Sequence, residues 1–259
     1  MIVAMSFENL HMKPIRMLPS HFFHLVLVGL LVATANNAVA ELAEGFDDAL
    51  VAPERSVEDR DRDSARKPKQ VLEFIGIEAG MTVLDVAAGA GWYTEVLSAA
   101  VGDDGYVISH NSFIYGPRNA ETVAAKAARL GNVTMLFAAY GDFRLDAEVD
   151  AALTGLNLHD FQNRSAEEAQ VFLSGIFMAL KPGGVFGVID HEGIAGSDNA
   201  SMHRIELATA KVAIENAGFI VEATSDALDN PADDHTLKYD DESLGRNTDR
   251  ILIRARKPE

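Results

Sequence analysis

The chain has 259 residues, of which 48% are hydrophobic and none is cysteine. It can therefore form one large packed domain, but no disulfide, thiolate metal site or cysteine nucleophile. Its 22 basic residues against 39 acidic ones give a net charge of −17. Because such a surface repels phosphate backbones, we predict no nucleic-acid partner.

The first forty residues have the pattern of an export signal. Lys13 and Arg16 form a basic region, residues 22–35 are mostly apolar, and Ala38-Val39-Ala40 matches a signal-peptidase site. The apolar run is shorter than the roughly 20 residues of a membrane-spanning helix. We predict a signal peptide over 1–40, cleavage after Ala40, a periplasmic or secreted protein and no stable membrane insertion after cleavage. The alternatives are an uncleaved anchor or a non-functional leader on a cytoplasmic protein.

Residues 41–66 form a charged N-terminal extension that is short of periodic apolar positions. Its alternating charges favour a solvated helix with internal ion pairs, and a lid over a pocket is the second interpretation. Pro68 then suits the first turn of a helix over 69–75.

From residue 82 onward, strand and helix patterns alternate, which predicts a mostly parallel sheet covered on both faces. The expected strands are 82–86, 106–109, 133–138, 149–156, 185–190, 219–223 and 250–256, and the expected helices are 92–101, 120–130, 165–180 and 202–217. Residues 181–184 (Lys-Pro-Gly-Gly) predict a helix stop and a turn before the fifth strand. Segment 226–248 is long for a bare loop, so we expect it to be functional or partly structured.

The first strand and the turn after it form the clearest binding motif. Residues 83–86 (Val-Leu-Asp-Val) are typical of a buried strand, and the small residues 87–91 (Ala-Ala-Gly-Ala-Gly) let a ligand approach the backbone. The helix that follows presents free N–H groups to that ligand. A dinucleotide fingerprint is excluded because Thr94 stands where Gly-x-Gly-x-x-Gly needs its third glycine.

Four motifs in this order resemble the class I S-adenosylmethionine-dependent methyltransferases. They are residues 83–91, 150–153 (Asp-Ala-Ala-Leu), 180–184 (Leu-Lys-Pro-Gly-Gly) and 217–219 (Ala-Gly-Phe). The resemblance implies an α/β methyltransferase-like domain over 67–259, a three-layer Rossmann-like sandwich whose mostly parallel seven-stranded sheet ends in an antiparallel hairpin. It also implies S-adenosyl-L-methionine as cofactor.

The chain also resembles a group of exported bacterial proteins described as predicted methyltransferases, which have no settled substrate. The segments that carry this resemblance are 66–68 (Arg-Lys-Pro), 188–191 (Val-Ile-Asp-His), 228–236 (Leu-Asp-Asn-Pro-Ala-Asp-Asp-His-Thr) and 248–250 (Thr-Asp-Arg).

The resemblance implies a set of cofactor-binding residues: Asp85, Ala87, Gly89, Gly91, Asn111, Asp142 and Asn157. Ala87 occupies the family's first glycine position, which we expect to be a sterically mild change. The acid that closes the second strand and binds the ribose is replaced by His110 or Asn111, and a neutral amide makes weaker hydrogen bonds than a carboxylate. Asp142 is the candidate acid on the adenine side, although spacing from Val133 points to Ala139 instead.

Methyl transfer needs a nucleophile held near the methyl group and, for a hydroxyl or carbon acid, a base. His159 or His191 is the candidate base because histidine titrates near neutral pH. Asp160 and Asp190 follow the same two strands and can orient these rings. We therefore predict His159, Asp160 and His191 as catalytic residues, with helix capping or loop hydrogen bonding as the structural alternative for each.

The same side chains could instead converge with His203 and His235 on a metal ion. No pair has the i, i+4 spacing of a helical zinc motif, so we predict no metal site. Residues 233–235 (Asp-Asp-His) favour a solvated acidic loop, with closure over a substrate as the second interpretation. Trp92 and Tyr93 either wall the pocket or pack the helix onto the sheet.

Together these features predict an exported S-adenosylmethionine-dependent methyltransferase that acts on a small molecule. The cofactor is made in the cytosol, so an exported enzyme lacks a ready supply. An exported non-catalytic module that binds a nucleoside or small ligand is therefore the alternative, and a metal-dependent hydrolase is the third hypothesis.

Overall fold

The computed structural model of the protein describes residues 41–114 and 116–259. These residues belong to one compact unit, and none of the helices among them combines the length and hydrophobicity needed to cross a bilayer. The predicted signal peptide over 1–40 lies outside the described residues.

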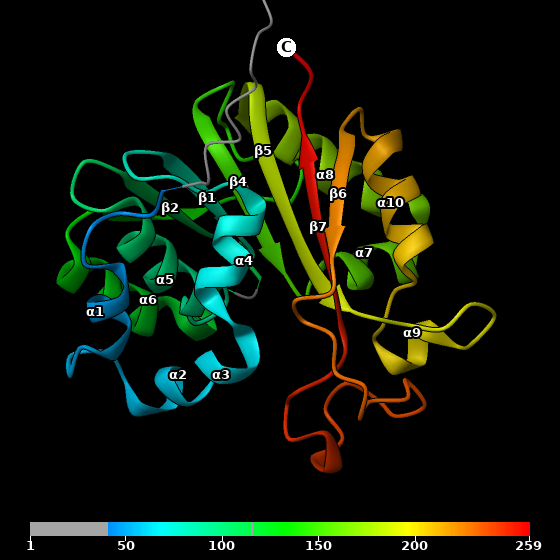
Figure 1. Cartoon of the computed structure of the whole chain (residues 1–259). Coiled ribbons are helices and arrows are strands. Elements are labelled where there is room, and N and C mark those ends of the chain that lie inside the picture. Colours follow the sequence, from blue (N-terminus) through cyan, green and yellow to red (C-terminus); the bar gives the residue numbers. More distant parts are fainter. Residues whose placement is uncertain (1–40, 115) are drawn as a thin grey trace, which may run out of the picture. The chain divides into compact units, whose positions relative to one another are not determined.

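A seven-stranded sheet forms the centre of the unit (Figure 1), in the order β3-β2-β1-β4-β5-β7-β6. Its strands are β1 (Thr82–Val86), β2 (Tyr106–Asn111), β3 (Val133–Phe137), β4 (Val149–Gly155), β5 (Leu180–His191), β6 (Ile220–Ser225) and β7 (Arg250–Arg256). Strands β1 to β5 pair in parallel, while β7 is antiparallel to both β5 and β6. The predicted parallel sheet with a terminal antiparallel hairpin is confirmed.

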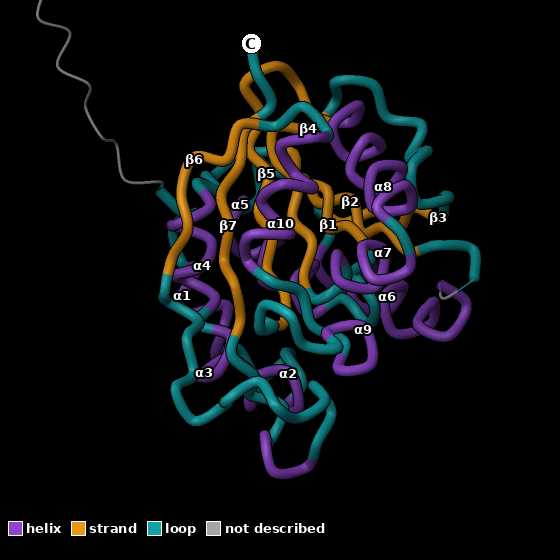
Figure 2. Tube along the Cα trace, turned by 90° about the vertical axis from the view of Figure 1, so that its right-hand side faces the viewer, coloured by secondary structure: helices purple, strands orange, loops and turns teal. Residues whose placement is uncertain are grey.

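Helices cover both faces of this sheet (Figure 2), as the apolar strands require. One face carries α4 (Pro68–Ile75), α5 (Trp92–Val101) and α6 (Gly116–Leu130), and the other carries α7 (Leu158–Arg164), α8 (Ala166–Ala179) and α10 (Leu207–Asn216). Along β1, Val83 packs into the first face while Leu84 and Val86 pack into the second, because successive side chains alternate.

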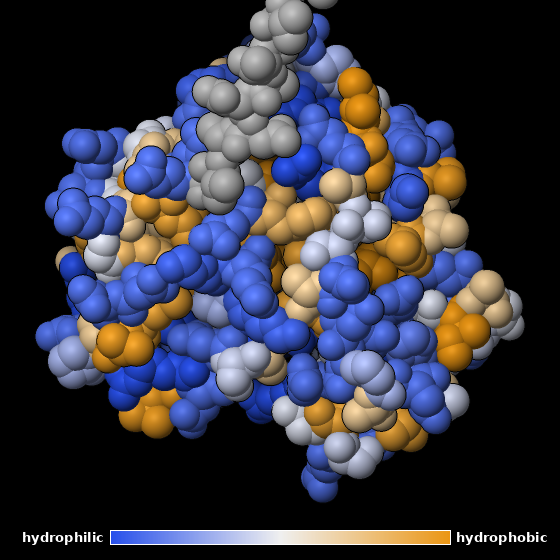
Figure 3. All heavy atoms as spheres, viewed as in Figure 1, coloured by the Kyte–Doolittle hydropathy of each residue, from blue (hydrophilic) through white to orange (hydrophobic). Residues whose placement is uncertain are grey.

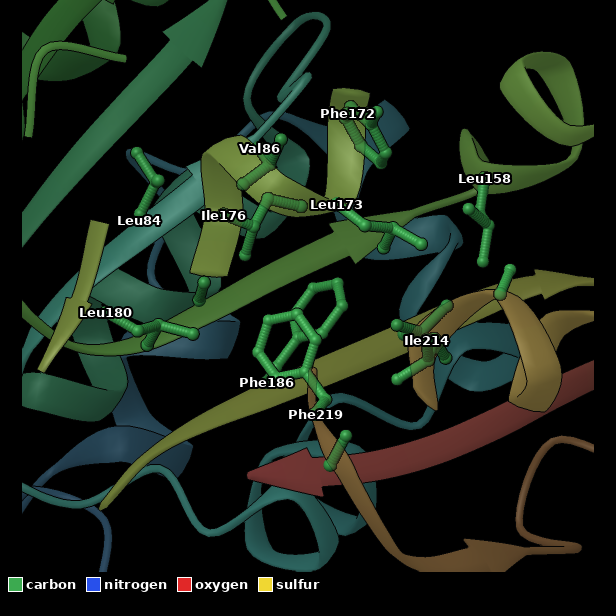
Figure 4. Packing of buried hydrophobic residues seen from close by; sticks show 14 of the residues in the cluster. Leu84, Val86, Leu158, Phe172, Leu173, Ile176, Leu180, Phe186, Ile214 and Phe219 are labelled. Atoms are coloured by element: carbon green, nitrogen blue, oxygen red, sulfur yellow. The ribbon is translucent and has the colours of Figure 1, made fainter. Parts of the chain in front are cut away.

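Aromatic and aliphatic side chains fill the second face (Figure 4). The rings of Phe186 on β5 and Phe219 lie 5.0 Å apart, beside Ile176 of α8 and Ile214 of α10. Complete burial of one such side chain stabilises the fold by about 1.5–3 kcal/mol. At the surface shown in Figure 3, hydrophobic residues occur in scattered groups among hydrophilic ones.

Three local features differ from the sequence predictions. The single helix expected over 202–217 is interrupted: α9 (Asn199–Met202) ends where His203 adopts a φ of 52°, and Ile205 N–H donates to His191 O before α10 begins. The predicted stop before residues 181–184 is confirmed, since α8 ends at Ala179, but these residues belong to β5, where they form an irregularity in the register with β4 between Leu180 and Val185. Helix α7 was not predicted.

The charged extension folds into α1 (Phe46–Val51), α2 (Val57–Asp61) and α3 (Asp63–Arg66). Trp92 Nε1 donates to Asp59 O over 2.9 Å, and the Arg66 guanidinium lies 4.6 Å from the centre of the Trp92 indole. Lys126 of α6 also forms an ion pair with Asp59. The extension therefore packs over the start of α5, which agrees with a covering segment better than with a free solvated helix.

The segment expected over 226–248 is partly structured, as predicted. It runs from the end of β6 to the start of β7, over 226–249, and contains the short 3₁₀ helix η1 (Glu242–Leu244). Asp233 is fully buried and accepts two 2.9 Å hydrogen bonds from Arg204, which also donates to Glu192 O and Leu237 O. The solvated-loop interpretation is therefore wrong for Asp233, because this buried ion pair anchors the segment beside α9.

Candidate functional site

The turn after β1 is held in place by the end of β2. Ala88 N–H donates to His110 O over 2.8 Å, and the Asn111 amide bonds Gly89 twice: Oδ1 accepts from Gly89 N–H and Nδ2 donates to Gly89 O, both over 3.0 Å. Ala87 N–H also donates to His110 Nδ1 over 3.3 Å. The side chains of His110 and Asn111, the two candidate ribose-binding residues, are therefore both directed at the turn. Burial lowers the pKa of His110 to about 4, so this ring is neutral.

The turn itself has left-handed backbone conformations at Ala87, Gly89 and Gly91, with φ values of 57°, 59° and 78°. Glycine adopts this region without strain, whereas a residue with a Cβ does not. The Ala87 replacement is consequently not mild, because it stores backbone strain at the point where the cofactor is expected.

Asp85 lies beneath the turn, and its exposed fraction is 1%. Its carboxylate accepts a 2.6 Å hydrogen bond from Thr94 Oγ1, which also lies 2.8 Å from Ser109 Oγ. Burial raises the pKa of Asp85 to about 7, against the opposing effect of the Thr94 hydrogen bond. Asp85 thus ties β1 to α5 and supports the turn from behind.

A cavity of about 650 Å³ lies in front of the turn, and we call it the turn cavity. Ala87, Gly89, Asn111 and Asn157 line it, so four of the predicted cofactor residues meet there. A Cβ added at Gly89 would meet no atom within 4 Å, which leaves the backbone open to a ligand.

Two other predicted cofactor residues lie away from the turn cavity. Gly91 is the N-cap of α5. Asp142 is exposed because the chain bends back after β3, so that Asp142 N–H donates to Ala139 O and its carboxylate accepts from Arg144 N–H. Tyr140 lines the cavity in place of both Asp142 and Ala139. An aromatic residue just after a predicted strand is the sequence signal that could have placed Tyr140 in the cavity.

A second cavity, of about 960 Å³, adjoins the first, and we call it the histidine cavity. His159, His191 and Tyr239 line it, together with residues of α2, α3 and segment 226–249. Asp160 and His203 line both cavities. The two cavities therefore share a wall at the carboxyl ends of β4 and β5, which lie at the lower end of the sheet in Figures 1 and 2.

Asp190 organises this wall from a fully buried position at the end of β5. Its Oδ1 accepts from His159 Nδ1 over 2.6 Å and from His191 N–H over 2.8 Å, and its Oδ2 accepts from His159 N–H over 2.8 Å. His159 Nε2 faces Asp160 Oδ1 at 3.3 Å. Burial disfavours the imidazolium, but the Asp190 charge and the Asp160 contact outweigh it and raise the pKa of His159 to about 10.

His191 has the opposite protonation state. Burial, reinforced by the neighbouring His159 cation and Arg250, lowers the pKa of His191 to about 4 despite Asp190. Its Nδ1 lies 2.6 Å from Thr248 Oγ1, and within the described part of the chain its Nε2 makes no hydrogen bond. Of the two predicted bases, the arrangement favours His191, which is neutral, over His159, which already carries a proton.

The remaining candidates divide between this wall and a separate pair. His203 Nδ1 lies 3.1 Å from Asp160 Oδ1, and its ring centre is 5.3 Å from that of Tyr239. His235 instead bonds Asp249, with Nε2 2.8 Å from Oδ2, and lines neither cavity. Tyr239 and Thr248 are the site residues that sequence reasoning missed, because they lie far along the chain from the strand-end motifs.

A third cavity, of about 710 Å³, lies at the opposite end of the strands, beside Gly80 before β1 and Asp104 before β2. Its buried charges, Arg55 and Glu95, face each other. Ligands of open α/β sheets bind at the carboxyl ends of the strands, so the shared-wall cavities are the candidate site.

Comparison with known proteins bears on the fold. Residues 64–138, from α3 to just past β3, match the family model described as protein-L-isoaspartate(D-aspartate) O-methyltransferase. No curated protein matches the chain.

Solved structures share the fold. A SAM-dependent methyltransferase from Aquifex aeolicus is 23% identical, with a TM-score of 0.57 over 75% of this chain and 92% of its own. A "possible exported protein" from Bordetella parapertussis is 16% identical, with a TM-score of 0.50 over 86% of this chain and 81% of its own. The cyclase SpnF is 19% identical, with a TM-score of 0.56 over 75% and 81%.

The chain therefore has the fold of the S-adenosylmethionine-dependent methyltransferases, as predicted. Since a cyclase shares this fold, the reaction has to be argued from the site.

Proposed function

We propose that the protein is an exported S-adenosylmethionine-dependent methyltransferase that methylates a small molecule. The observation that carries this proposal is the shared wall: a cavity over the glycine turn directly adjoins a cavity lined by histidines. S-adenosyl-L-methionine is the expected cofactor of the first cavity, and the methyl acceptor belongs in the second.

The turn cavity suits this cofactor in most respects. Its volume falls within the range of small-molecule sites. The open backbone at Gly89 can accept close approach, Asn119 and Asn157 offer neutral polar groups, and Tyr140 offers an aromatic surface for a base. The ribose would find no carboxylate at Asn111, whose amide is occupied by Gly89. We therefore expect weaker cofactor binding than a charged partner would give.

When bound, the cofactor supplies an electrophilic methyl group for in-line displacement. The residues of this chain hold the acceptor and take its proton. His191 is the proposed base because it lines the histidine cavity, Thr248 fixes its Nδ1, and its Nε2 makes no hydrogen bond to a described residue. Helices α2 and α3 and the segment around Tyr239 enclose the acceptor and limit its contact with water.

Calorimetry on the purified protein tests the first step. We expect saturable heat with S-adenosyl-L-methionine and with its demethylated product, and we expect Gly89→Leu to abolish it because the new side chain would fill the cavity and strain the left-handed backbone of the turn. Absence of heat with both compounds at millimolar concentration would overturn the proposal.

Methyl transfer separates the enzyme from a non-catalytic binding module. The protein is incubated with cofactor labelled in its methyl group and a small-molecule extract, and the label is followed by chromatography. We expect a labelled product with wild type and with His235→Ala, whose ring lies outside both cavities, and a loss of about 10²-fold or more with His191→Ala. Binding without any labelled product would favour the module.

Export is tested by fractionating cells and sequencing the N-terminus of the mature protein. We expect a periplasmic or secreted chain that begins at Glu41. An uncut cytoplasmic chain would overturn this part of the proposal and remove the difficulty of cofactor supply.

A further inference from the structure

We infer that a divalent transition-metal ion binds in the wall between the two cavities, with His159, Asp160 and His203 as its protein ligands. Among residues 41–114 and 116–259, this is the one set of three side chains that can each offer a ligand atom with all three atoms within 4.8 Å of one another. The sequence predicted no metal site, because two ligands are adjacent at the start of α7 and the third follows α9, so no helical spacing encodes them.

The separations between these donor atoms suit a small ion. His159 Nε2 and His203 Nδ1 lie 3.3 and 3.1 Å from Asp160 Oδ1. Metal bonds of about 2.0–2.1 Å, as nitrogen and oxygen ligands make to zinc, would place tetrahedral donors about 3.3 Å apart. An ion can therefore take the place of the proton that His159 Nε2 holds toward Asp160, and the third pair of ligand atoms, one on each histidine, also lies within 4.8 Å.

The residues behind the wall have the form of an outer ligand shell. Asp190 is fully buried, and its Oδ1 bonds His159 Nδ1 over 2.6 Å, which leaves Nε2 as the ligand atom. Its Oδ2 also accepts from the backbone N–H of His159, which fixes the position of the main chain that carries the ring. A carboxylate that orients a ligating histidine in this way is a recurrent feature of protein metal sites.

The ligand set indicates which ion would bind and how. Two imidazoles and one carboxylate favour Zn²⁺ or Fe²⁺ over Mg²⁺ or Ca²⁺, and three protein ligands leave coordination positions open. The Asp160 and His203 side chains are 51% and 40% exposed, which gives the ion a path from solvent. The second histidine–aspartate pair, His235 with Asp249, has only two donors and serves as an internal comparison.

The position of the ion indicates which class of molecule accepts the methyl group, an inference that rests on the proposed function. Because Asp160 and His203 face both cavities, an ion held by them adjoins the acceptor and the expected methyl group at once. A Lewis acid at this point lowers the pKa of a hydroxyl or thiol bound to it. We therefore assign the acceptor to small molecules that bear an alcohol, phenol or thiol group able to ligate a metal.

Metal titration of the tag-free, chelator-treated full chain tests the site. With Co²⁺ as probe, we expect one equivalent to bind with visible absorption bands of four- or five-coordinate cobalt, and Zn²⁺ to displace it. His159→Gln and His203→Asn should each weaken binding at least tenfold, and Asp190→Asn should weaken it 10- to 100-fold as an outer-shell change. His235→Gln, which removes the comparison pair, should bind as wild type does.

His203→Asn decides the outcome even if the buried His159 variant fails to fold, because asparagine tolerates the left-handed backbone at this position. The inference is overturned if wild type binds no stoichiometric Co²⁺, or if His203→Asn binds it as tightly as wild type. Metal binding without any binding of S-adenosyl-L-methionine would sink the methyltransferase proposal alone. Cofactor binding without metal binding would sink the metal site alone.

Discussion

The two cavities use their polar side chains in opposite ways. Around the turn cavity, His110 and Asn111 bond the backbone of the turn while Asp85 bonds Thr94 behind it, so the cavity presents mainly backbone and neutral groups. In the shared wall, Asp190 and His159 form a buried charged pair from which Asp160 reaches both cavities. In the proposed function, the turn cavity holds the cofactor and the shared wall carries the groups for chemistry.

Among the variants that test this contrast, Asp190→Ala has the largest expected effect on stability. Removing this carboxylate deletes three hydrogen bonds and leaves the buried His159 charge with only the more exposed Asp160 as a partner, so we expect a loss of about 3–5 kcal/mol in the free energy of unfolding. Urea denaturation with a chelator present measures it. Asp240→Ala is the control, since its ion pair with Lys238 is exposed and should be worth less than about 1 kcal/mol. Equal effects would show that Asp190 does not organise the wall.

Much of the fold could be predicted because local physical constraints specify it. Strands 82–86 and 250–256 and helix 92–101 were located to the residue. Strand 82–86 lies in the parallel part of the sheet and is mostly apolar, and glycine is among the residues preferred at a helix N-cap, the position of Gly91 before helix 92–101. The break at His203 was missed because residues 202–217 have helical propensity throughout. The left-handed backbone of His203 and the pairing of Ile205 with His191, a tertiary contact, separate α9 from α10.

A smaller effect, from the turn side, appears in the pH dependence of stability. Because the folded-state pKa of Asp85 is raised to about 7, from an ordinary value of 3.8, its contribution is complete below about pH 4 and is lost as pH rises through 7. Each pH unit in that window costs up to about 1.4 kcal/mol. We compare wild type with Asp85→Asn, which cannot ionise.

The measurement is the free energy of unfolding of both proteins at pH 5 and pH 8. Asp85→Asn should gain about 2 kcal/mol on wild type between these two values. Parallel pH profiles for the two proteins would contradict the burial of an ionisable Asp85 beneath the turn.

Asn111→Asp tests whether the side chain at the end of β2 stabilises the turn or binds the ligand. Resemblance alone suggests that an acid here restores a ribose contact, but a carboxylate would face Gly89 O without a proton to donate. We expect a loss of about 1–2 kcal/mol in stability and no gain in cofactor affinity. Asn119→Asp adds the same charge to the cavity wall with no hydrogen bond to the turn at stake, and should change stability by no more than about 0.5 kcal/mol. Tighter cofactor binding by Asn111→Asp at unchanged stability would reverse the assignment.

The site was less predictable than the fold because a place at the end of a strand indicates where a residue lies but not which way its side chain points. The family resemblance placed Asn157 and Asn111 at the cofactor site, and both line the turn cavity, yet nothing local shows that the Asn111 amide turns back to Gly89. Asp142 was misplaced because its direction depends on a bend after β3. The wall requires His159, Asp190 and His203 from three separate segments, and their meeting is a property of the packed sheet.

The smallest effect concerns the strained residue of the turn itself. Ala87 has a φ of 57°, so Ala87→Gly relieves strain but adds freedom to the unfolded chain, and we expect a net gain of about 0.5 kcal/mol. Ala88→Gly, one residue on and without a positive φ, should instead cost about 0.5–1 kcal/mol. Urea denaturation of both variants compares them. If both lose stability equally, Ala87 is not strained. A gain in stability without a gain in cofactor affinity would show that strain at Ala87 shapes the turn and has no part in binding.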